Sequence, residues 1–586
     1  MLLFSVLLQN MTIDRKWIVK ESGNPAVIRQ LSSELGIDHV LANLLVQRNI
    51  TTSEQAREFF RPELSKLHDP FLMKDMDKAV ERLNKAIDSG EKILIYGDYD
   101  VDGTTAVALL YTFIRNFNPN VEYYIPDRYD EGYGISYKGI DWGVDNGYTL
   151  IIALDCGIKA VEKVSYAKEK GVDFIICDHH LPGDELPEAY AILDPKRTDC
   201  TYPFDDLSGC GVGFKLIQAY AQFKGYPFAW VEAYLDLVVV SISADLVSMT
   251  GENRILAYYG LQRLNEAPSK GLMSIIKLSG LENHKITIDD IVFKIGPRIN
   301  AAGRMESGRT AVHLLVSRND KEAKEIGAAI NTHNNDRKNI DKEITKEAIE
   351  SVKREKDLLS KNATIVFDPK WHKGVVGIVA SRLVEAFYRP TIVLTESNGL
   401  ITGSARSIAG FDLYEAIEEC SEYLENFGGH MYAAGLTLKK ENLAPFSEKF
   451  EKVVARKITD DILTPIVNID TYLDFKQITP KFFRILKQFQ PFGPGNLSPV
   501  FITENVYDNG NGRKVGSDSG HMKLELIQED EPYRHISAIA FNRAEHYEHL
   551  HAGNPVDVCY SIAENYYRGI ANIQLRVKDI KKKELF

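Results

Sequence analysis

The chain has 586 residues, a length that predicts three or four domains at about 150 residues each. Its 44% hydrophobic and 26% charged residues are typical of an ordinary globular protein, and no apolar run is long enough to span a bilayer. The formal net charge of −12 weighs against nucleic acid as a partner but does not exclude it, because binding needs only a local basic groove.

Six cysteines are scattered at positions 156, 177, 200, 210, 420 and 559, with no Cys-x-x-Cys pair. This spacing predicts neither a disulfide framework nor a zinc site and is compatible with a reducing cytoplasm. Residues 1–8 are apolar but lack a basic stretch and a small-residue cleavage site, so we expect no signal peptide. A start at Met11 would remove this segment.

After a small helical lead-in (residues 1–70), strand and helix patterns alternate. Apolar runs predict strands at residues 93–96, 121–125, 150–154 and 173–177, and helices are predicted at residues 104–116 and 159–170. Such alternation predicts an α/β fold with a mostly parallel, doubly wound sheet.

Three aspartates, Asp98, Asp100 and Asp102, follow the first of these strands. Alternate side chains of a strand point to the same side, so we expect the three carboxylates to crowd onto one face. Like charges at that distance repel unless cations lie between them. The pattern therefore predicts a divalent metal site at the end of the strand.

Further acids end other apolar runs: Asp155 after residues 150–154, Asp178 with His179 and His180 after residues 173–177, and Asp245 after residues 235–244. Sites in open parallel sheets form beyond the carboxyl ends of the strands, so these side chains can converge. A single aspartate there could equally cap a helix, and Asp245 could also belong to an ion pair. The whole set favours a metal site.

Carboxylates and imidazoles without thiolates suit Mn²⁺ or Mg²⁺ better than structural zinc. Two ions about 3.5–4 Å apart would polarise a phosphoryl group and generate hydroxide from bound water. We therefore expect hydrolysis of a phosphoester without a covalent intermediate.

The second half of the chain changes character twice. Residues 319–357 are rich in charged residues and asparagine, which predicts a solvated helix joining two lobes; DNA contact by Arg337 and Lys338 is the alternative. A second α/β pattern follows, with strands at residues 364–367 and 391–394 and helices at residues 374–387 and 413–426. Beyond residue 464, several short strand patterns predict a small barrel or sandwich.

Several motifs identify the chain as similar to the DHH phosphoesterase superfamily. They are Gly97-Asp-Tyr-Asp-Val-Asp-Gly103, Asp155-Cys-Gly157, Asp178-His-His180 and Asp245. Four more resemble the RecJ family within it: Gly296-Pro-Arg-Ile-Asn-Ala-Ala-Gly-Arg304, Ser404-Ala-Arg-Ser407, residues 428–435 and Pro491-Phe-Gly-Pro-Gly-Asn496. The resemblance covers nearly the whole chain from about residue 15.

The resemblance implies a 5′→3′ exonuclease that degrades single-stranded DNA to mononucleotides in DNA recombination and repair, with two Mn²⁺ or Mg²⁺ ions. It assigns residues 71–318 to a DHH catalytic domain, 319–358 to the connecting helix, 359–463 to the DHH-associated (DHHA1) domain and 464–586 to an OB-fold domain that binds nucleic acid.

The resemblance also implies a role for each acidic-site residue. Asp100 and Asp155 would hold one ion, and Asp102, Asp155, His179 and Asp245 the other, with Asp155 bridging. Asp98 would be a ligand directly or through water. The catalytic residues would be Asp178, which orients the histidines, and His180, which faces the scissile phosphate.

Candidates for substrate binding lie outside the acidic set. Arg298, Asn300 and Arg304 are expected in a Gly-rich loop, as phosphate ligands or as helix caps. By family analogy Arg406 and Ser407 would anchor the 5′ end, whereas His430 is either a phosphate ligand or a packing residue. Gly209-Cys-Gly-Val-Gly213 lacks the full spacing of a dinucleotide loop and predicts a tightly packed helix start.

Two other functions stay open at this point. One is a small-substrate DHH phosphodiesterase acting on oligoribonucleotides, cyclic dinucleotides or pyrophosphate, which would not need the strand-rich tail. The other is an inactive relative that only binds DNA, which would require missing acids. We expect a cytoplasmic monomer that binds single-stranded DNA and no membrane; whether a single-strand-binding protein or a helicase delivers the substrate stays open.

Overall fold

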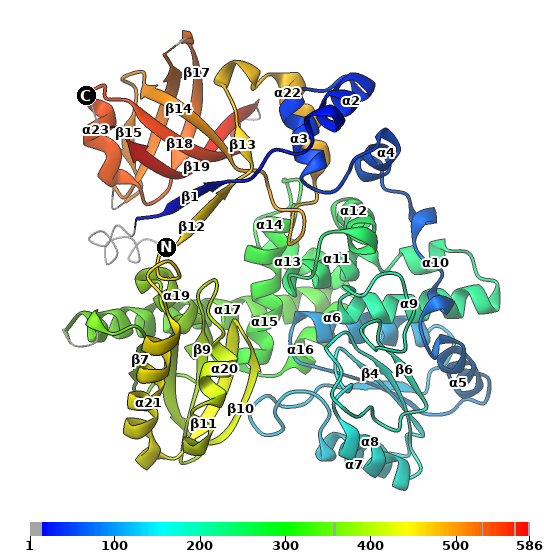
Figure 1. Ribbon diagram of the computed structural model, residues 1–586. Helices are drawn as coiled ribbons and strands as arrows, with labels where there is room; N and C mark the ends of the chain where they lie inside the picture. The colour runs from blue at the N-terminus through cyan, green and yellow to red at the C-terminus, as the bar shows by residue number, and fades with distance from the viewer. Residues whose placement is uncertain (1–13, 355–358, 518, 530, 568–569, 584–586) are drawn as a thin grey trace. The chain divides into compact units, whose positions relative to one another are not determined.

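The computed structural model describes residues 14–354, 359–517, 519–529, 531–567 and 570–583 (Figure 1). Contacts within the chain divide it into two compact units. The parallel-sheet unit comprises Arg57–Asp336 together with Gln488–Leu497, and the mixed unit comprises the rest of the described chain. Within the described ranges, no helix combines the length and the apolar character that crossing a membrane requires.

A five-stranded parallel sheet lies at the centre of the parallel-sheet unit, in the order β3-β2-β4-β5-β6. Its strands are β2 (Ile93–Gly97), β3 (Val121–Tyr124), β4 (Leu150–Leu154), β5 (Asp173–Cys177) and β6 (Ala191–Leu193). The predicted parallel sheet is confirmed. Strands buried on both faces read as continuous apolar runs, which is why the predicted bounds of β4 and β5 match those observed.

Helices cover both faces of this sheet (Figure 1). Ile93 and Ile95 of β2 belong to one core, with α6 (Val101–Ile114), α9 (Gly209–Lys224) and α11 (Leu235–Ala244). Leu94 and Tyr96 belong to the other, with α7 (Tyr137–Asp145) and α8 (Val161–Glu169). The remaining helices of the unit are α5 (Met76–Asp88), α10 (Ala229–Glu232), α12 (Gly251–Glu266), α13 (Lys270–Leu278), α14 (Ile288–Asp290), α15 (Gly296–Met305) and α16 (Gly308–Val316).

The segment expected to be a Gly-rich loop, with Arg298, Asn300 and Arg304, is instead helix α15. Pro297 lies near its start, just after the π-helical turn Ile291–Ile295, and that turn changes the hydrogen-bond register where proline has no N–H to donate. Gly303 serves packing rather than flexibility, because a Cβ there would lie 2.7 Å from the carbonyl oxygen of Tyr99. The small residues therefore bring the helix close to the strand–helix turn beside it.

The charged stretch forms the expected long helix, α17 (Asp320–Arg354), of 35 residues. At 1.5 Å per residue it is about 50 Å long, and it continues from one unit into the other. The end of the predicted helix, residues 355–357, lies outside the described residues.

A second sheet, ordered β10-β11-β9-β8-β7, belongs to the mixed unit. Its strands are β7 (Thr364–Phe367), β8 (Thr391–Ser397), β9 (Leu400–Arg406), β10 (Leu424–His430) and β11 (Ala433–Leu438), accompanied by α19 (Val376–Phe387), α20 (Leu413–Glu418) and α21 (Leu443–Lys457). The helix predicted over residues 413–426 is wrong in its second half, since it ends at Glu418. Residues from Leu424 pair with β11 across a tight hairpin, so a tertiary pairing overrides the local helical pattern.

The strand-rich tail forms a closed five-stranded barrel, β14-β18-β19-β17-β16, in which β16 pairs back with β14. Closure removes exposed edges and gives the OB-like architecture that was expected. The strands of the tail are β12 (Ile466–Ile469), β13 (Thr471–Tyr472), β14 (Phe501–Asp508), β15 (Arg513–Val515), β16 (His521–Gln528), β17 (Glu531–Ala540), β18 (Val556–Tyr567) and β19 (Ile570–Lys582), with helices α22 (Pro480–Leu486) and α23 (Tyr547–His551).

The described part of the lead-in contains the expected helices α2 (Pro25–Leu35), α3 (His39–Val46) and α4 (Ser53–Phe60). It also contains an unexpected strand, β1 (Lys16–Val19), which pairs in parallel with β12. Gln488–Leu497 leaves the tail to join the parallel-sheet unit, where the buried Arg254 guanidinium donates to the carbonyls of Phe489 and Pro491.

Candidate active site

Three acids stand directly after neighbouring strands of the parallel sheet. Asp98 follows β2, Asp155 follows β4 and Asp178 follows β5, and all three are at least 98% buried. Because β2, β4 and β5 are adjacent and parallel, their carboxyl ends meet at one edge of the sheet. The structure therefore brings these acids together, as the sequence predicted.

The three alternating aspartates reach this edge, but they do not lie along a continuing strand as expected. β2 stops at Gly97, Asp100 caps helix α6 by accepting a hydrogen bond from the N–H of Gly103 (3.0 Å), and Asp102 lies in the first helical turn. A Cβ on Gly103 would lie 2.5 Å from the carbonyl oxygen of Asp98. Only glycine allows so abrupt a change from strand to helix, which is what converges the three side chains.

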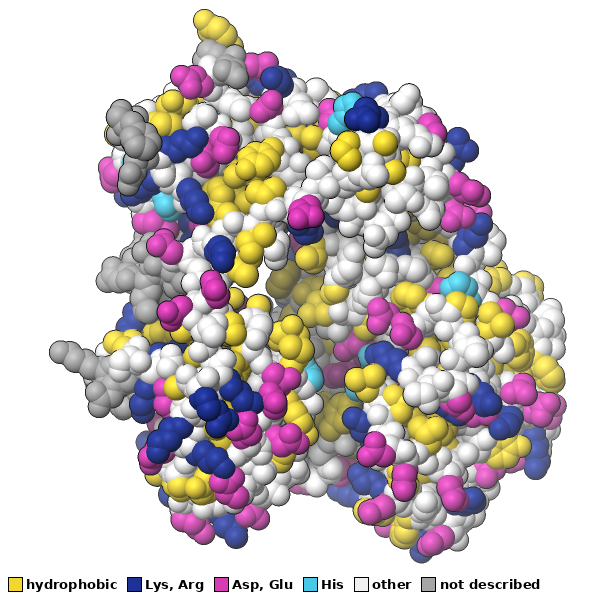
Figure 2. All heavy atoms as spheres, viewed as in Figure 1, with side chains coloured by type: hydrophobic (Ala, Val, Ile, Leu, Met, Phe, Trp, Pro, Cys, Tyr) yellow, Lys and Arg dark blue, Asp and Glu magenta, His cyan; other side chains and the backbone are white. Residues whose placement is uncertain are grey.

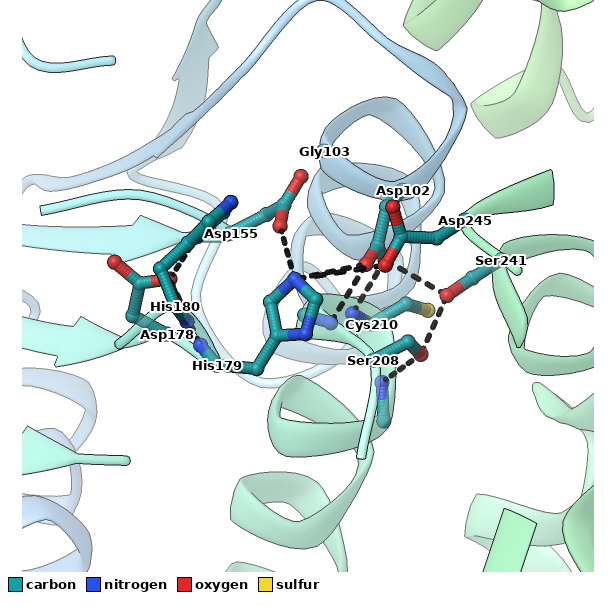
Figure 3. A network of polar contacts seen from close by, with 12 residues as sticks. Asp102, Gly103, Asp155, Asp178, His179, His180, Ser208, Cys210, Ser241 and Asp245 are labelled. Carbon is teal, nitrogen blue, oxygen red and sulfur yellow. Dashed lines mark hydrogen bonds and ion pairs between the residues drawn. The ribbon is translucent and has the colours of Figure 1, made fainter. Parts of the chain in front are cut away.

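His179 is the centre of the acidic cluster (Figure 3). Its Nε2 atom lies 3.1 Å from Asp155 Oδ1, 3.7 Å from Asp102 Oδ2 and 3.7 Å from Asp245 Oδ2. Neither ring nitrogen of this buried histidine has a hydrogen-bond partner among the described residues. A buried imidazole surrounded by carboxylates and lacking hydrogen bonds has the arrangement of a metal ligand.

The Asp102 carboxylate is fixed from behind. Oδ2 accepts the N–H of Gly209 and Oδ1 accepts the N–H of Cys210, each at 2.7 Å, so the carboxylate rests on the N-terminus of α9. The Ser241 hydroxyl also donates to Oδ1 (2.7 Å). The predicted helix start at Gly209 is confirmed, with Ser208 as its N-cap, and this helix orients a site residue.

Asp155 adopts a left-handed backbone conformation (φ 59°), which is uncommon for a residue other than glycine. Gly209 makes room for it, because a Cβ there would lie 2.6 Å from the Cβ of Asp155. Backbone strain of this kind persists where the surrounding structure enforces it, often at functional sites.

Asp178 and His180 form a tight pair. His180 Nδ1 lies 2.6 Å from Asp178 Oδ1, and Asp178 also accepts the backbone N–H groups of Ile158 and His179. Burial alone would lower the pKa of His180, but the hydrogen bond to Asp178 outweighs it and raises that pKa to about 9. Conversely, these bonds outweigh burial at Asp178 and lower its pKa to about 2. His180 therefore carries a proton at neutral pH.

The other acids of the cluster are buried close enough together to repel one another. Burial, and then the charge of Asp102, raises the pKa of Asp155 well above its usual value and that of Asp245 to about 8. Burial, and then a neighbouring aspartate, does the same for Asp98 and Asp100. Such a cluster is stable in its ionised form only with cations among the carboxylates.

The donor atoms fit hard divalent ions. Two groups, Asp155 with His179 and His180, and Asp102 with His179 and Asp245, each place one ligand atom per residue within 4.8 Å of the others. The nearby thiols of Cys156 and Cys210 are buried, which raises their pKa values well above the usual range, so they stay protonated. Oxygen and imidazole ligands without thiolate suit Mn²⁺ or Mg²⁺.

Comparison with known proteins agrees with this chemistry. The profile of the DHH family, N-terminal domain, matches residues 92–242, that of the DHHA1 domain residues 360–456 and that of the RecJ OB domain residues 469–579. The single-stranded-DNA-specific exonuclease RecJ of Bacillus subtilis is 38% identical over 554 residues, which cover 94% of this chain and 69% of the relative. The chain belongs to the RecJ family.

Solved RecJ structures share the fold. The crystal structure of Thermus thermophilus RecJ in complex with Mn²⁺ superposes with a TM-score of 0.83 at 26% identity, covering 97% of this chain and 80% of the other. The complex of the same RecJ with Mg²⁺ gives a TM-score of 0.77 at 25% identity, covering 97% and 79%.

One loop at the site was missed by sequence reasoning. The Tyr133 hydroxyl donates to the carbonyl of Asp155 (3.1 Å) and lies 3.2 Å from His180 Nε2, while half of the side chain stays exposed. The guanidinium of Arg128 lies over the ring of Tyr99, 4.7 Å from its centroid. A usable signal was present, because this loop follows β3 at the same edge of the sheet as the acids.

The α15 candidates differ in their surroundings. Arg298 donates to Asn331 Oδ1 and to the carbonyls of Lys294 and Leu278, so its guanidinium is engaged within the unit. The carbonyl of Arg304 accepts from Tyr129 in the loop described above, which places Arg304 beside the site; Asn300 is half-buried on the same helix.

The DHHA1 candidates lie together on the second sheet. Ala433 of β11 pairs with Arg406 of β9 on one side and with His430 of β10 on the other, and Ser407 follows Arg406. Arg406 Nη1 donates to Ser404 Oγ (2.7 Å), and a Cβ on Gly377 would lie 2.9 Å from Arg406 Nη2. The guanidinium therefore lies against the first turn of α19, in the mixed unit.

Proposed function

We propose that the chain is a metal-dependent exonuclease that degrades single-stranded DNA 5′→3′ to mononucleotides, in DNA recombination and repair. The observation that carries the proposal is the ring of carboxylates around His179 Nε2, in a chain that belongs to the RecJ family. The substrate class comes from the relatives, which are named single-stranded-DNA-specific exonucleases.

In this proposal two Mn²⁺ or Mg²⁺ ions share the acidic cluster. Asp100 and Asp155 hold one ion; Asp102, Asp155, His179 and Asp245 hold the other; Asp98 contributes directly or through water. The converging donor atoms of Asp102, His179 and Asp245 support the second set. An oxygen of Asp98 and the ring nitrogens of His179 have no hydrogen-bond partner among the described residues and are available to a cation.

The bound ions would supply Lewis acidity and a deprotonated water for attack on phosphorus. Residues of the protein hold and transfer the proton that the substrate takes up. Asp178 keeps His180 protonated and fixes its ring through Nδ1, so that Nε2 can donate to a phosphate oxygen or to the leaving oxygen. Tyr133, hydrogen-bonded beside His180, limits where the scissile phosphate can lie.

Further contacts would position the strand. Arg304 and Asn300 on α15, and Arg406, Ser407 and His430 in the DHHA1 domain, would bind phosphates, with Arg406 at the 5′ end. Arg298 belongs to the same set by motif, although its present hydrogen bonds suit a structural role better. The assignment of residues 71–318, 319–358, 359–463 and 464–586 to four functional parts, after a lead-in of residues 1–70, belongs to the same proposal.

The barrel would hold the strand beyond the cleaved end. A pocket of about 450 Å³ opens on it, lined by strands β16 to β19, and includes Lys523, Arg534 and His535. Cations on an OB-like barrel suit the backbone of a single strand. This role favours a polymer substrate over the cyclic dinucleotides and short oligoribonucleotides of other DHH enzymes.

We infer a cytoplasmic monomer, which a single-strand-binding protein or a helicase would supply with substrate. All six cysteines are free thiols, as a reducing compartment requires.

The test is an assay with Mn²⁺ on 5′- and 3′-labelled single-stranded and duplex DNA. We expect mononucleotides from the 5′ end of single strands only, and no product in EDTA. Asp155→Asn should lower turnover at least about a thousandfold, because the bridging carboxylate is lost; the exposed Asp77→Asn serves as its control. Activity of Asp155→Asn near that of Asp77→Asn would refute the metal cage.

A further inference from the structure

A second pocket lies on the parallel-sheet unit, beside the edge strand β3. Its volume is about 610 Å³, within the usual range for small-molecule sites. The end of α6, strand β3, helix α16 and the start of α17 form its walls, and it includes none of the residues of the acidic cluster. We call it the β3-edge pocket.

Three arginines from different elements line this pocket: Arg115, Arg309 and Arg318. In the described part of the chain, none of them has a carboxylate oxygen within 4.0 Å. Basic and acidic side chains are interspersed on the face drawn in Figure 2, in a chain of net charge −12. The buried Arg82 and Arg197, by contrast, each pair with two carboxylates.

Neutral groups hold the three guanidiniums in place. Arg115 donates to the hydroxyl of Tyr111 and lies 5.4 Å from its ring centroid; Arg309 lies 5.6 Å from the ring centroid of Tyr123. Arg318 Nη2 donates to Asn116 Oδ1 (3.2 Å). These contacts orient the cations without neutralising them, which is the condition for binding an anion.

Two acids also line the pocket, and both are engaged locally. Glu322 accepts from the Ser317 hydroxyl (2.9 Å) and lies 3.0 Å from His313 Nε2, while Glu122 accepts the N–H of Tyr123 (3.0 Å). The three guanidiniums therefore keep an excess of positive charge at the pocket.

Helix dipoles explain only part of this arrangement. Arg115 follows the end of α6 and Arg318 the end of α16, where the negative end of the dipole favours a cation. Arg309 lies in the first turn of α16, where the dipole disfavours one. A ligand anion would offset that cost.

We propose that the β3-edge pocket binds the phosphate of a nucleotide through Arg115, Arg309 and Arg318. The ligand is either a phosphate of a single strand or a free mononucleotide, since both offer the same chemistry. Binding here requires no divalent ion, so this proposal can fail while the exonuclease proposal stands.

The test measures binding to the full chain in EDTA, where the proposed hydrolysis does not proceed. The probes are a 20-residue oligothymidylate and thymidine 5′-monophosphate, measured as a function of salt. Arg309→Gln and Arg115→Gln should each weaken binding about three- to tenfold and lower the log–log salt slope for the oligonucleotide by about 0.7.

Arg57→Gln, an exposed arginine outside the pocket, is the control and should change neither quantity. Arginine-dependent binding of the monophosphate identifies a free nucleotide as the ligand; dependence seen only with the oligonucleotide identifies a strand. Affinity and salt slope equal to those of Arg57→Gln with both probes would overturn the proposal. So would tighter, arginine-dependent binding of polyglutamate, which would indicate an acidic protein instead.

Discussion

At the scale of single residues, one buried cluster combines opposite electrostatic tasks. Asp178 accepts enough hydrogen bonds to stay ionised, and it keeps His180 protonated. Asp155 and Asp245, in the same cluster, accept too few hydrogen bonds to offset burial and the repulsion among the carboxylates. Asp178 and His180 can therefore move a proton, whereas Asp155 and Asp245 can bind cations. The surroundings of each carboxylate, and not its residue type, decide between these two roles.

The repulsion predicts a pH dependence of metal binding. Metal-bound Asp245 must be ionised, yet its pKa without metal is raised to about 8, so binding below that pH displaces a proton. We expect Mn²⁺ affinity to rise about tenfold per pH unit between pH 6 and 7, for each proton displaced, and to level off above pH 8. Titration calorimetry in buffers of different ionisation enthalpy would measure this release; affinity independent of pH would contradict it.

Asp178→Asn should lower the pKa of His180 from about 9, because burial is then opposed only by the charges of Asp245 and Asp102. At Mn²⁺ concentrations that saturate the site at every pH, turnover should fall at neutral pH and recover partly on acidification, where His180 regains its proton. Histidine NMR of the metal-free protein gives the pKa directly. Asp184→Asn, in the exposed loop that follows, is the matched control.

At the scale of elements, the apolar runs of β2, β4 and β5 were readable from sequence, and with them the acids at their carboxyl ends. Two things were not. The strand–helix turn at Gly103 depends on the space left by the Asp98 backbone, and the support of Asp102 by Ser241 and the start of α9 depends on helix packing. Both arise from tertiary contacts that no local pattern encodes.

Helix α9 is anchored by a buried ion pair far along its length. Lys215 and Glu252 lie 2.9 Å apart and are almost fully buried, and Glu252 also accepts from Tyr202. Glu252→Gln should destabilise the parallel-sheet unit by about 3–5 kcal/mol, because it leaves the buried ammonium of Lys215 without its carboxylate partner. The double change Lys215→Met with Glu252→Gln should recover part of that loss.

Urea unfolding measures this difference. The exposed pair Lys168 and Glu188, 2.8 Å apart, is the control, and Glu188→Gln should leave the free energy of unfolding nearly unchanged. Equal effects of Glu188→Gln and Glu252→Gln would show that burial of the pair is unimportant.

At the scale of the whole molecule, the sequence predicted the order of the domains but not which segments of the chain belong to each compact unit. The tail was expected to be separate, yet Gln488–Leu497 joins the parallel-sheet unit through Arg254 and through a hydrogen bond from the N–H of Met249 to Pro494. These contacts join segments more than 230 residues apart, so no local pattern reports them. Deleting the tail would also remove hydrogen-bond acceptors of Arg254. Point substitutions in the barrel are therefore the cleaner test.

Lys523→Gln in the barrel pocket should raise KM for long single strands about three- to tenfold and leave kcat and the cleavage of dinucleotides unchanged. The reason is that, in the proposed function, the barrel holds a part of the strand that a dinucleotide lacks. Lys85→Gln on α5, exposed and outside both pockets, is the control. Equal losses on dinucleotides and on long strands would argue against a strand-holding role for the barrel.

The central claim is that buried carboxylates and His179 hold two divalent ions. Anomalous X-ray diffraction from crystals soaked in Mn²⁺ tests it most directly. We expect two peaks on either side of the Asp155 carboxylate, about 3.5–4 Å apart, and a single weak peak or none in Asp155→Asn. Wild-type crystals that show no manganese among Asp100, Asp102, Asp155, His179 and Asp245 would contradict the account.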